Sequence, residues 1–305
     1  MHHHARCSFL AGMTGLPHRL THGLRPSRPH HTTASAAVRF GKCLALFGFM
    51  SAFVAPTTYA TPTHDIRLSA QRASYELTLA ESSGGTTLSA SGHMTYSVHD
   101  TCTAWATQQH LDIQSVTRNG GETHLVSDYT TLESKDGHHL AFRTVQKSNN
   151  TILQAVSGEA TLTPNGGEVH YEKPLRKTLK LQAGTLFPMA HTAAILEAAA
   201  SGKTEISPLL FDGTAADGAQ YTYISTYGWE ATPPAPPFAL LAHLPTTRVH
   251  VAFFNTTPDS MMPDYEIGMR YFANGVSDKL DMDFGDFRMS GTLQHLSIPQ
   301  APKKC

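Results

Sequence analysis

The strongest constraint on the fold is a period-two alternation of apolar and polar residues that recurs along most of the chain. Tyr75, Leu77 and Leu79 alternate with polar residues between positions 66 and 80, and Met94 and Tyr96 do so in the next run, over residues 88–98. A period of two indicates strands that bury one face. Similar runs cover residues 105–116, 123–132, 139–147, 151–162, 168–181, 206–211, 221–229, 248–254, 266–272, 279–284 and 287–296.

Short glycine-containing segments separate many of these runs. They are Gly84-Gly85, Asn119-Gly120-Gly121, Asp136-Gly137, Ser157-Gly158 and Asn165-Gly166-Gly167. Because glycine accepts a positive φ, each segment can reverse the chain between two antiparallel strands. Short strands at this spacing predict an all-β, mainly antiparallel protein rather than a parallel α/β sheet.

One segment, residues 188–200, breaks the alternation and predicts a helix. It is rich in alanine and other helix formers, Pro188 suits the first helical turn, and Ser201-Gly202 supplies a stop. Strands are predicted on both sides of this helix. We therefore expect residues 61–305 to form a single β domain with one main packed helix.

A sheet of this many strands has to deal with its own curvature. Open sheets of more than about ten strands tend to curl, split or close. We therefore expect a long curved sheet that forms a β-spiral or a broken barrel. The alternation leaves open whether the interior is filled with side chains or holds a ligand cavity.

Residues 38–60 have the pattern of a cleavable signal peptide. Arg39 and Lys42 precede an apolar run over residues 43–55, and Pro56 and small residues lead up to Ala60. The run is shorter than the roughly 20 residues that a membrane-spanning helix needs. We predict cleavage after Ala60, so that residues 1–60 are an N-terminal extension and leader, and no transmembrane segment remains after cleavage.

The charge balance argues against a nucleic-acid partner. The sequence has 23 Lys and Arg and 24 Asp and Glu, and residues 1–60 contain six of the basic residues and none of the acidic ones. Cleavage therefore leaves 17 basic residues against 24 acidic ones and a net charge of about −7. Binding to phosphate backbones needs clustered Lys and Arg, and the exported sequence has no such run.

Export leaves two widely separated cysteines. Cys7 and Cys43 belong to the segment that is removed, whereas Cys102 and Cys305 remain. Disulfides form in oxidising compartments, so we expect a single long-range disulfide between Cys102 and Cys305. The alternative is two free thiols.

Two groups of residues are candidates for catalysis or metal binding. His191, on the predicted helix, is a candidate general base or metal ligand, and Asp281, Asp283 and Asp286 form an acidic cluster that could hold calcium. The sequence has no Gly-x-Ser-x-Gly or His-Glu-x-x-His motif and lacks the EF-hand spacing. We therefore favour a packing role for His191 and a solvated outer face for the aspartates, with no catalytic residue, metal site or cofactor.

Several segments together resemble the EipB-like family of periplasmic envelope integrity proteins of alphaproteobacteria. They are residues 100–105 (Asp-Thr-Cys-Thr-Ala-Trp), 129–137 (Tyr-Thr-Thr-Leu-Glu-Ser-Lys-Asp-Gly), 184–192 (Gly-Thr-Leu-Phe-Pro-Met-Ala-His-Thr), 211–213 (Phe-Asp-Gly), 274–277 (Asn-Gly-Val-Ser), 283–287 (Asp-Phe-Gly-Asp-Phe) and the final Cys305. Their order and spacing cover essentially the whole exported chain.

The resemblance carries several implications. It implies a periplasmic location, a spiral or broken barrel, and a disulfide that joins an early cysteine to one at the C-terminus, which here are Cys102 and Cys305. It also implies a role in envelope integrity, in a family for which no enzymatic activity is established, and a link to a periplasmic tetratricopeptide-repeat protein. The chain has Thr103-Ala104 where the family has Asp-Gly, so the turn after Cys102 is expected to differ locally.

Two functional hypotheses follow. In the favoured one, the protein is a non-enzymatic periplasmic scaffold or binding protein that supports envelope integrity and binds a partner protein or a lipid-like ligand. In the alternative, it is a periplasmic envelope hydrolase or metal-dependent enzyme that uses His191 or the cluster of Asp281, Asp283 and Asp286.

Overall fold

A single curved sheet carries almost all of the regular structure in the computed structural model, which describes residues 66–82, 86–231, 236, 238–254, 262–302 and 305. One α-helix, α1 (Pro188–Ala200), and the short 3-10 helix η2 (Ala239–Leu241) accompany it. The strands are β1 (Gln71–Ser82), β2 (Thr87–Asp100), β3 (Ala104–Thr117), β4 (Glu122–Ser134), β5 (His139–Ser148), β6 (Thr151–Thr163), β7 (Gly166–Lys173), β8 (Lys177–Leu181), β9 (Thr185–Leu186), β10 (Glu205–Ile206), β11 (Leu209–Leu210), β12 (Gln220–Glu230), β13 (Thr246–Phe254), β14 (Tyr265–Phe272), β15 (Ser277–Asp283) and β16 (Phe287–Ser297).

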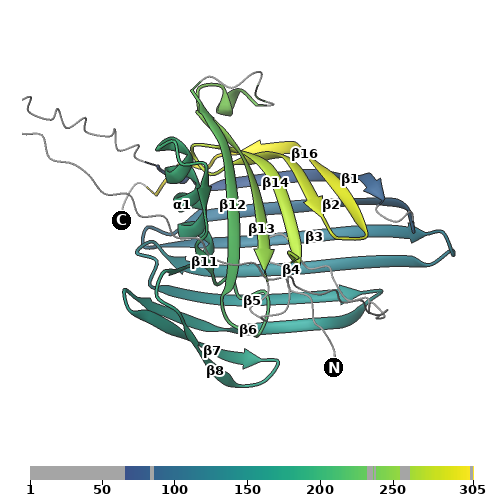
Figure 1. Ribbon diagram of the computed structural model, residues 1–305, viewed down its shortest axis with the longest axis horizontal. Helices are drawn as coiled ribbons and strands as arrows, with labels where there is room; N and C mark the ends of the chain where they lie inside the picture. Colours follow the sequence, from purple (N-terminus) through teal and green to yellow (C-terminus); the bar gives the residue numbers. More distant parts are fainter. Residues whose placement is uncertain (1–65, 83–85, 232–235, 237, 255–261, 303–304) are drawn as a thin grey trace, which may run out of the picture. The chain divides into compact units, whose positions relative to one another are not determined.

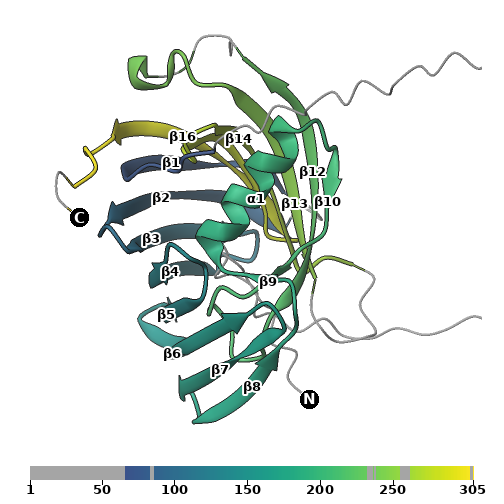
Figure 2. The ribbon, with the colours of Figure 1, turned by 90° about the vertical axis from the view of Figure 1, so that its left-hand side faces the viewer.

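Fifteen of these strands form one hydrogen-bonded path, and β10 joins it by pairing with β12. The path runs from β8 back through the chain to β1, crosses to β16, and continues back through β15 to β12, β11 and β9 (Figure 1). Nearly all of the pairings are antiparallel, and β9 with β11 is parallel. The sheet curls into a nearly closed barrel whose end strands, β8 and β9, leave one open seam (Figure 2). The predicted all-β broken barrel is confirmed.

The predicted helix is also confirmed, with the predicted bounds. α1 lies on the concave side of the sheet, where it packs against β12 and β10 (Figure 2). The predicted leader over residues 1–60, with its cleavage site after Ala60, lies outside the described residues.

One predicted turn is wrong. Ser157-Gly158 lies inside β6, where Gly158 pairs with Tyr171 of β7. A Cβ at Gly158 would lie 2.2 Å from the carbonyl oxygen of His170 and 3.0 Å from the ring of Phe142. This glycine therefore permits a close approach between neighbouring strands rather than a chain reversal.

The inner face of the barrel holds two apolar clusters separated by polar side chains. The larger cluster joins α1 to β1–β3 and β12–β16, and the smaller one joins β5–β7 to Phe187 and Phe211. Between them β3, β4 and β5 turn inward buried polar residues, which are Thr107, Gln109, Ser127, Thr131, Thr144 and Gln146. The interior is therefore packed but chemically mixed.

Candidate functional site

The N-terminus of α1 is held by a carboxylate from another part of the chain. Its N-cap residue, Phe187, provides no side-chain hydrogen bond. Instead, Glu133 of β4 accepts hydrogen bonds from the backbone N–H groups of Met189, at 2.7 Å, and Ala190, at 2.9 Å. Glu133 is only 1% exposed. Free N–H groups at a helix N-terminus attract a carboxylate, so Glu133 fixes α1 inside the barrel.

Burial sets the protonation of Glu133. Desolvation raises the pKa of its carboxyl group to about 7, although the two N–H groups of α1 oppose the shift. The sequence analysis missed this residue. The sequence did contain a partial indication of this role, because a lone glutamate falls at an inward-facing position of the alternating segment 129–137.

A second interior contact joins the same segment to residues 211–213. The hydroxyl of Tyr129 donates to the carbonyl oxygen of Asp212 at 3.0 Å. The Asp212 carboxylate is buried and accepts hydrogen bonds from the backbone and hydroxyl of Thr214. Gly213 has a φ of +74°, and a Cβ there would lie 2.3 Å from the ring of Phe142. Three of the segments on which the family resemblance rests therefore meet inside the barrel.

His191 points into the interior and hydrogen-bonds with a strand. Its Nε2 lies 3.2 Å from the hydroxyl of Thr222, which donates its own proton to the carbonyl oxygen of Pro208 at 2.7 Å. The Thr222 hydroxyl therefore accepts from His191, which assigns the proton to Nε2. Burial lowers the pKa of His191 to about 4. The imidazole is thus neutral at pH 7, with one nitrogen engaged in a structural hydrogen bond.

The space around α1 is too small for a substrate. Two cavities lie there, each of about 20 Å³, one lined by His191 and Ile195 and the other by Tyr75, Tyr96 and Met189. A cavity needs about 10–15 Å³ to hold one water molecule, so each admits little more than water. These parts of the interior are filled with side chains.

Two members of the predicted acidic cluster lie beside an arginine. Asp281 and Asp283 are on β15, and Asp286 follows in the turn. Arg288 pairs with Asp281, lies 4.0 Å from Asp283, and contacts Glu81 of β1 at 3.3 Å. Arg288 therefore already pairs with Asp281 and lies close to Asp283, whereas Asp286 is exposed. Within the described ranges, no group of three or more His, Cys, Asp or Glu side chains could hold a metal ion.

A buried ion pair on the neighbouring strands was not foreseen. Arg270 of β14 donates to the carboxylate of Asp278 of β15 from Nε at 2.7 Å and from Nη2 at 2.5 Å, and both side chains are at most 5% exposed. The guanidinium also lies 5.0 Å from the ring centre of Phe272. The turn residues Asn274 and Gly275 indicate a hairpin here, but only its three-residue loop, residues 273–275, places Arg270 opposite Asp278.

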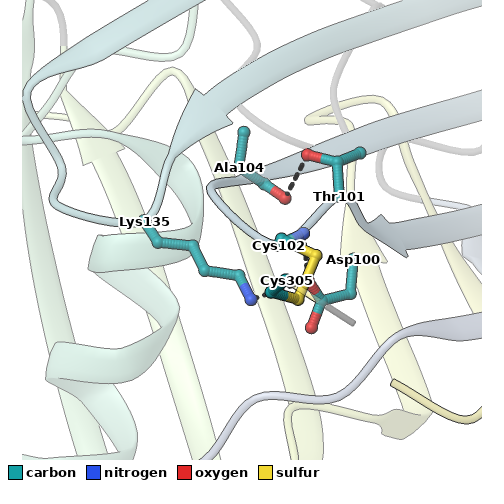
Figure 3. The surroundings of a disulfide bond; sticks show 6 residues. All are labelled: Asp100, Thr101, Cys102, Ala104, Lys135 and Cys305. Atoms are coloured by element: carbon teal, nitrogen blue, oxygen red, sulfur yellow. Dashed lines mark hydrogen bonds and ion pairs between the residues drawn. A yellow bond between two sulfur atoms is a disulfide. The ribbon is translucent and has the colours of Figure 1, made fainter. Parts of the chain in front are cut away.

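Cys102 and Cys305 are joined by a disulfide that spans 203 residues of sequence (Figure 3). Cys102 lies in the turn between β2 and β3, and its Cα is 5.5 Å from that of Cys305. Lys135, at the end of β4, reaches the same turn and pairs with Asp100 at 2.7 Å. The bridge therefore attaches the C-terminal segment after β16 to the β2–β3 hairpin.

The turn that carries Cys102 forms without the family's Asp-Gly. Asp100 Oδ1 accepts the backbone N–H of Cys102 at 2.8 Å, and the Thr101 hydroxyl donates to the carbonyl oxygen of Ala104 at 2.9 Å. The positive φ of the turn falls on Cys102, at +72°. Cys102 is therefore the left-handed residue of this turn, and side-chain hydrogen bonds of Asp100 and Thr101 stabilise the turn.

We expect Glu133 and His191 to give opposite pH dependences of stability. Since the folded pKa of Glu133 is about 7 against an ordinary 4.5, this residue makes the free energy of unfolding fall as pH rises from 4.5 to 7, by about 3 kcal/mol. His191 has a folded pKa of about 4, so it makes the free energy of unfolding rise as pH rises from 4 to 6.5.

Glu133→Gln should therefore expose the histidine contribution. In urea denaturation across pH 4.5–8, the variant should gain stability relative to the parent as pH rises to 7, whereas His191→Asn should show the fall due to Glu133. A difference between parent and Glu133→Gln that is constant with pH would contradict the assignment.

The fold defines a β-barrel-like protein with an interior helix and an open seam between β8 and β9, in which the disulfide ties the segment after β16 to the β2–β3 turn. The chain belongs to the EipB-like family, whose model matches residues 62–300. The predicted family is confirmed.

The relatives agree with this assignment. The chain is 28% identical over 249 residues to the cell envelope integrity protein EipB of Brucella abortus (strain 2308), covering 78% of this chain and 87% of that protein. A crystal structure of a β-barrel-like protein of the domain of unknown function DUF1849 from Brucella abortus matches with a TM-score of 0.70 and 26% identity, over 77% of this chain and 100% of that one. No helix in the described part of the chain is long and apolar enough to cross a membrane.

Proposed function

We propose that this protein supports the integrity of the cell envelope from the periplasm and does so without catalysis, as a scaffold or binding protein. Membership of the EipB-like family, together with the name of its Brucella abortus relative, carries the proposal. The leader pattern in residues 38–60 supports export, and the long-range disulfide suits an oxidising compartment.

The interior geometry supports a non-enzymatic role. His191 is neutral, buried and bonded to Thr222, and the cavity beside it holds little more than water. Asp281 and Asp283 are partly neutralised by Arg288. Both candidate groups of the hydrolase alternative are thus engaged in structural contacts, and no observation in the described residues favours that alternative.

The proposed partners are a periplasmic tetratricopeptide-repeat protein and a lipid-like ligand. The two cavities beneath α1, of about 20 Å³ each, cannot hold an acyl chain, so a lipid-like ligand would bind elsewhere. Native mass spectrometry of protein purified from periplasm tests this: a retained lipid or protein partner supports a binding role, and the bare chain argues against it.

Deletion of the gene tests the proposal in the cell. We expect the deletion strain to become sensitive to detergents and to antibiotics that act on the cell wall, and the parent sequence to restore resistance. His191→Ala and Asp283→Ala should restore it equally, because neither residue is proposed to do chemistry. Normal resistance in the deletion strain would contradict the envelope role. Failure of the two variants to restore resistance, although both are well folded, would favour the alternative that the protein is an enzyme.

A further inference from the structure

The outer face of the barrel carries a cleft of about 640 Å³ over β16, β1, β2 and β3. Its lining combines outward-facing polar side chains of these strands with four residues of the interior cluster or packed against it, which are Ala73, Tyr96, Leu296 and Phe238, the residue before η2. Sites for small ligands usually measure about 300–1,000 Å³. The cleft is therefore much larger than the cavities beneath α1 and is open to solvent-borne ligands.

Strand register places the lining side chains in two adjacent rows across the sheet. In one row Arg72 of β1 lies between Ser297 of β16 and Ser97 of β2. In the next row Ser74 of β1 lies between His295 of β16 and Thr95 of β2. Directly paired residues on one face have Cβ atoms about 4.5–5.5 Å apart. Arg72 is therefore surrounded by hydroxyl groups, with an imidazole diagonally across.

A β-bulge creates this arrangement. The register of β1 with β16 shifts between Ser74 and Tyr75, so that Ser74 pairs with His295 while Tyr75 pairs with Leu293. Gln294 is the extra residue, and both Gln294 and His295 are exposed. Bulges re-aim side chains. Without this one, His295 and Ser297 would face inward, away from Arg72.

The cleft carries the positive charge of Arg72, and its described lining has no carboxylate. Besides Arg72, its lining includes His295 and, farther along β2, His99, and none of its described lining residues is Asp or Glu. Among the described residues Arg72 makes no ion pair. Elsewhere on the outer face His110 pairs with Asp128, and Lys180 with Glu168. On the outer face of β1 the nearest acidic residue is Glu76, four positions from Arg72, and it is bonded to Gln294.

We propose that this cleft binds a phosphate group. A guanidinium forks onto a phosphate with two parallel hydrogen bonds, and serine and threonine hydroxyls can donate to its remaining oxygens. Arg72, Ser74, Ser97 and Ser297 supply such donors from several directions, which suits a phosphate better than a planar carboxylate. Phe238 offers an apolar wall for the part of the ligand beyond the phosphate. The phosphate could be free or could be part of a lipid headgroup.

Calorimetric titration of the full chain tests the site with two probes, inorganic phosphate and soluble short-chain phosphatidylglycerol. We expect saturable binding that shifts the NMR resonances of His99 and His295, and an at least tenfold weaker affinity for Arg72→Gln. Binding of both probes identifies a general phosphate site. Binding of phosphatidylglycerol alone identifies a lipid headgroup site, and binding of inorganic phosphate alone identifies a site for free phosphate.

Arg143→Gln is the matched control. Arg143 is an exposed arginine on the outer-facing side of β5 and does not line the cleft. It should leave both affinities unchanged, and thermal melting should show that both variants are folded. Absence of binding to either probe would overturn the proposal, as would an equal loss of affinity in Arg72→Gln and Arg143→Gln, which would indicate unspecific attraction to a cation. The site is independent of the proposed envelope function, so a normal deletion strain leaves this test intact.

Discussion

Replacing Cys102 by serine should lower the free energy of unfolding of the oxidised protein by up to about 5 kcal/mol. In the chain-entropy model a disulfide stabilises by restricting the unfolded chain, and a bridge across 203 residues gives roughly this value, although measured effects are often smaller. Cys305→Ser should lose the same amount, because either substitution removes the same bridge. The double variant should be no less stable than either single one. Urea denaturation under oxidising conditions measures all three.

The parent protein under a reductant is the control for this experiment. Its stability should fall to that of the serine variants, and the variants should not respond to the reductant. If Cys102→Ser and Cys305→Ser unfold at the same urea concentration as the oxidised parent, the bridge does not form in solution. A Cys102→Ser variant distinctly less stable than Cys305→Ser would instead point to the Cys102 turn, with its positive φ, as a second contribution.

Asp278→Ala should destabilise the protein by about 3–5 kcal/mol, because it leaves the guanidinium of Arg270 buried without its partner. The pair is bidentate and both side chains are at most 5% exposed, so solvent cannot replace the lost carboxylate. Arg270→Met combined with Asp278→Leu should recover most of the loss, since it removes both buried charges at similar volume. Urea denaturation of the three variants measures the effect.

An exposed pair on the same sheet provides the comparison. Lys180 of β8 pairs with Glu168 of β7 at 2.7 Å, but the side chain of Lys180 is 85% exposed. Because water screens exposed pairs, Glu168→Ala should destabilise the protein far less than Asp278→Ala. Equal losses from the two substitutions would mean that burial of the Arg270–Asp278 pair does not determine its contribution.

Much of the fold could be predicted because its signals are local. Alternation such as Tyr75-x-Leu77-x-Leu79 depends only on which side of a strand faces the interior, and Pro188 with Ser201-Gly202 marks a helix by backbone chemistry alone. The prediction failed at Gly158, where glycine serves a close contact with the backbone of His170. A contact between strands leaves no mark that distinguishes it from a turn in the sequence.

The candidate site was less accessible to sequence reasoning. His191 and the three aspartates were identified by residue type, yet their environments depend on Thr222 and Arg288, which are distant or unremarkable in the sequence. Glu133 was missed altogether, because its role depends on α1 lying across the inner face of β4. Glu133 and Met189 are 56 residues apart in the sequence, and they come into contact only because the sheet curls around α1.

By itself, the sequence determined most of the long strands, the main helix, the family and the two cysteines left after predicted leader cleavage, because alternation, helix propensity and motif order are properties of short segments. It did not separate β7 from β8 within 168–181 and did not predict β9. Only the tertiary structure decided that the N-terminus of α1 lies against Glu133, that Arg288 pairs with Asp281, and that a bulge in β16 gathers Arg72 and His295 in one cleft. These outcomes depend on register and curvature, which bring distant segments together. A shift of one residue in the pairing register would move every side chain of a strand to the other face of the sheet.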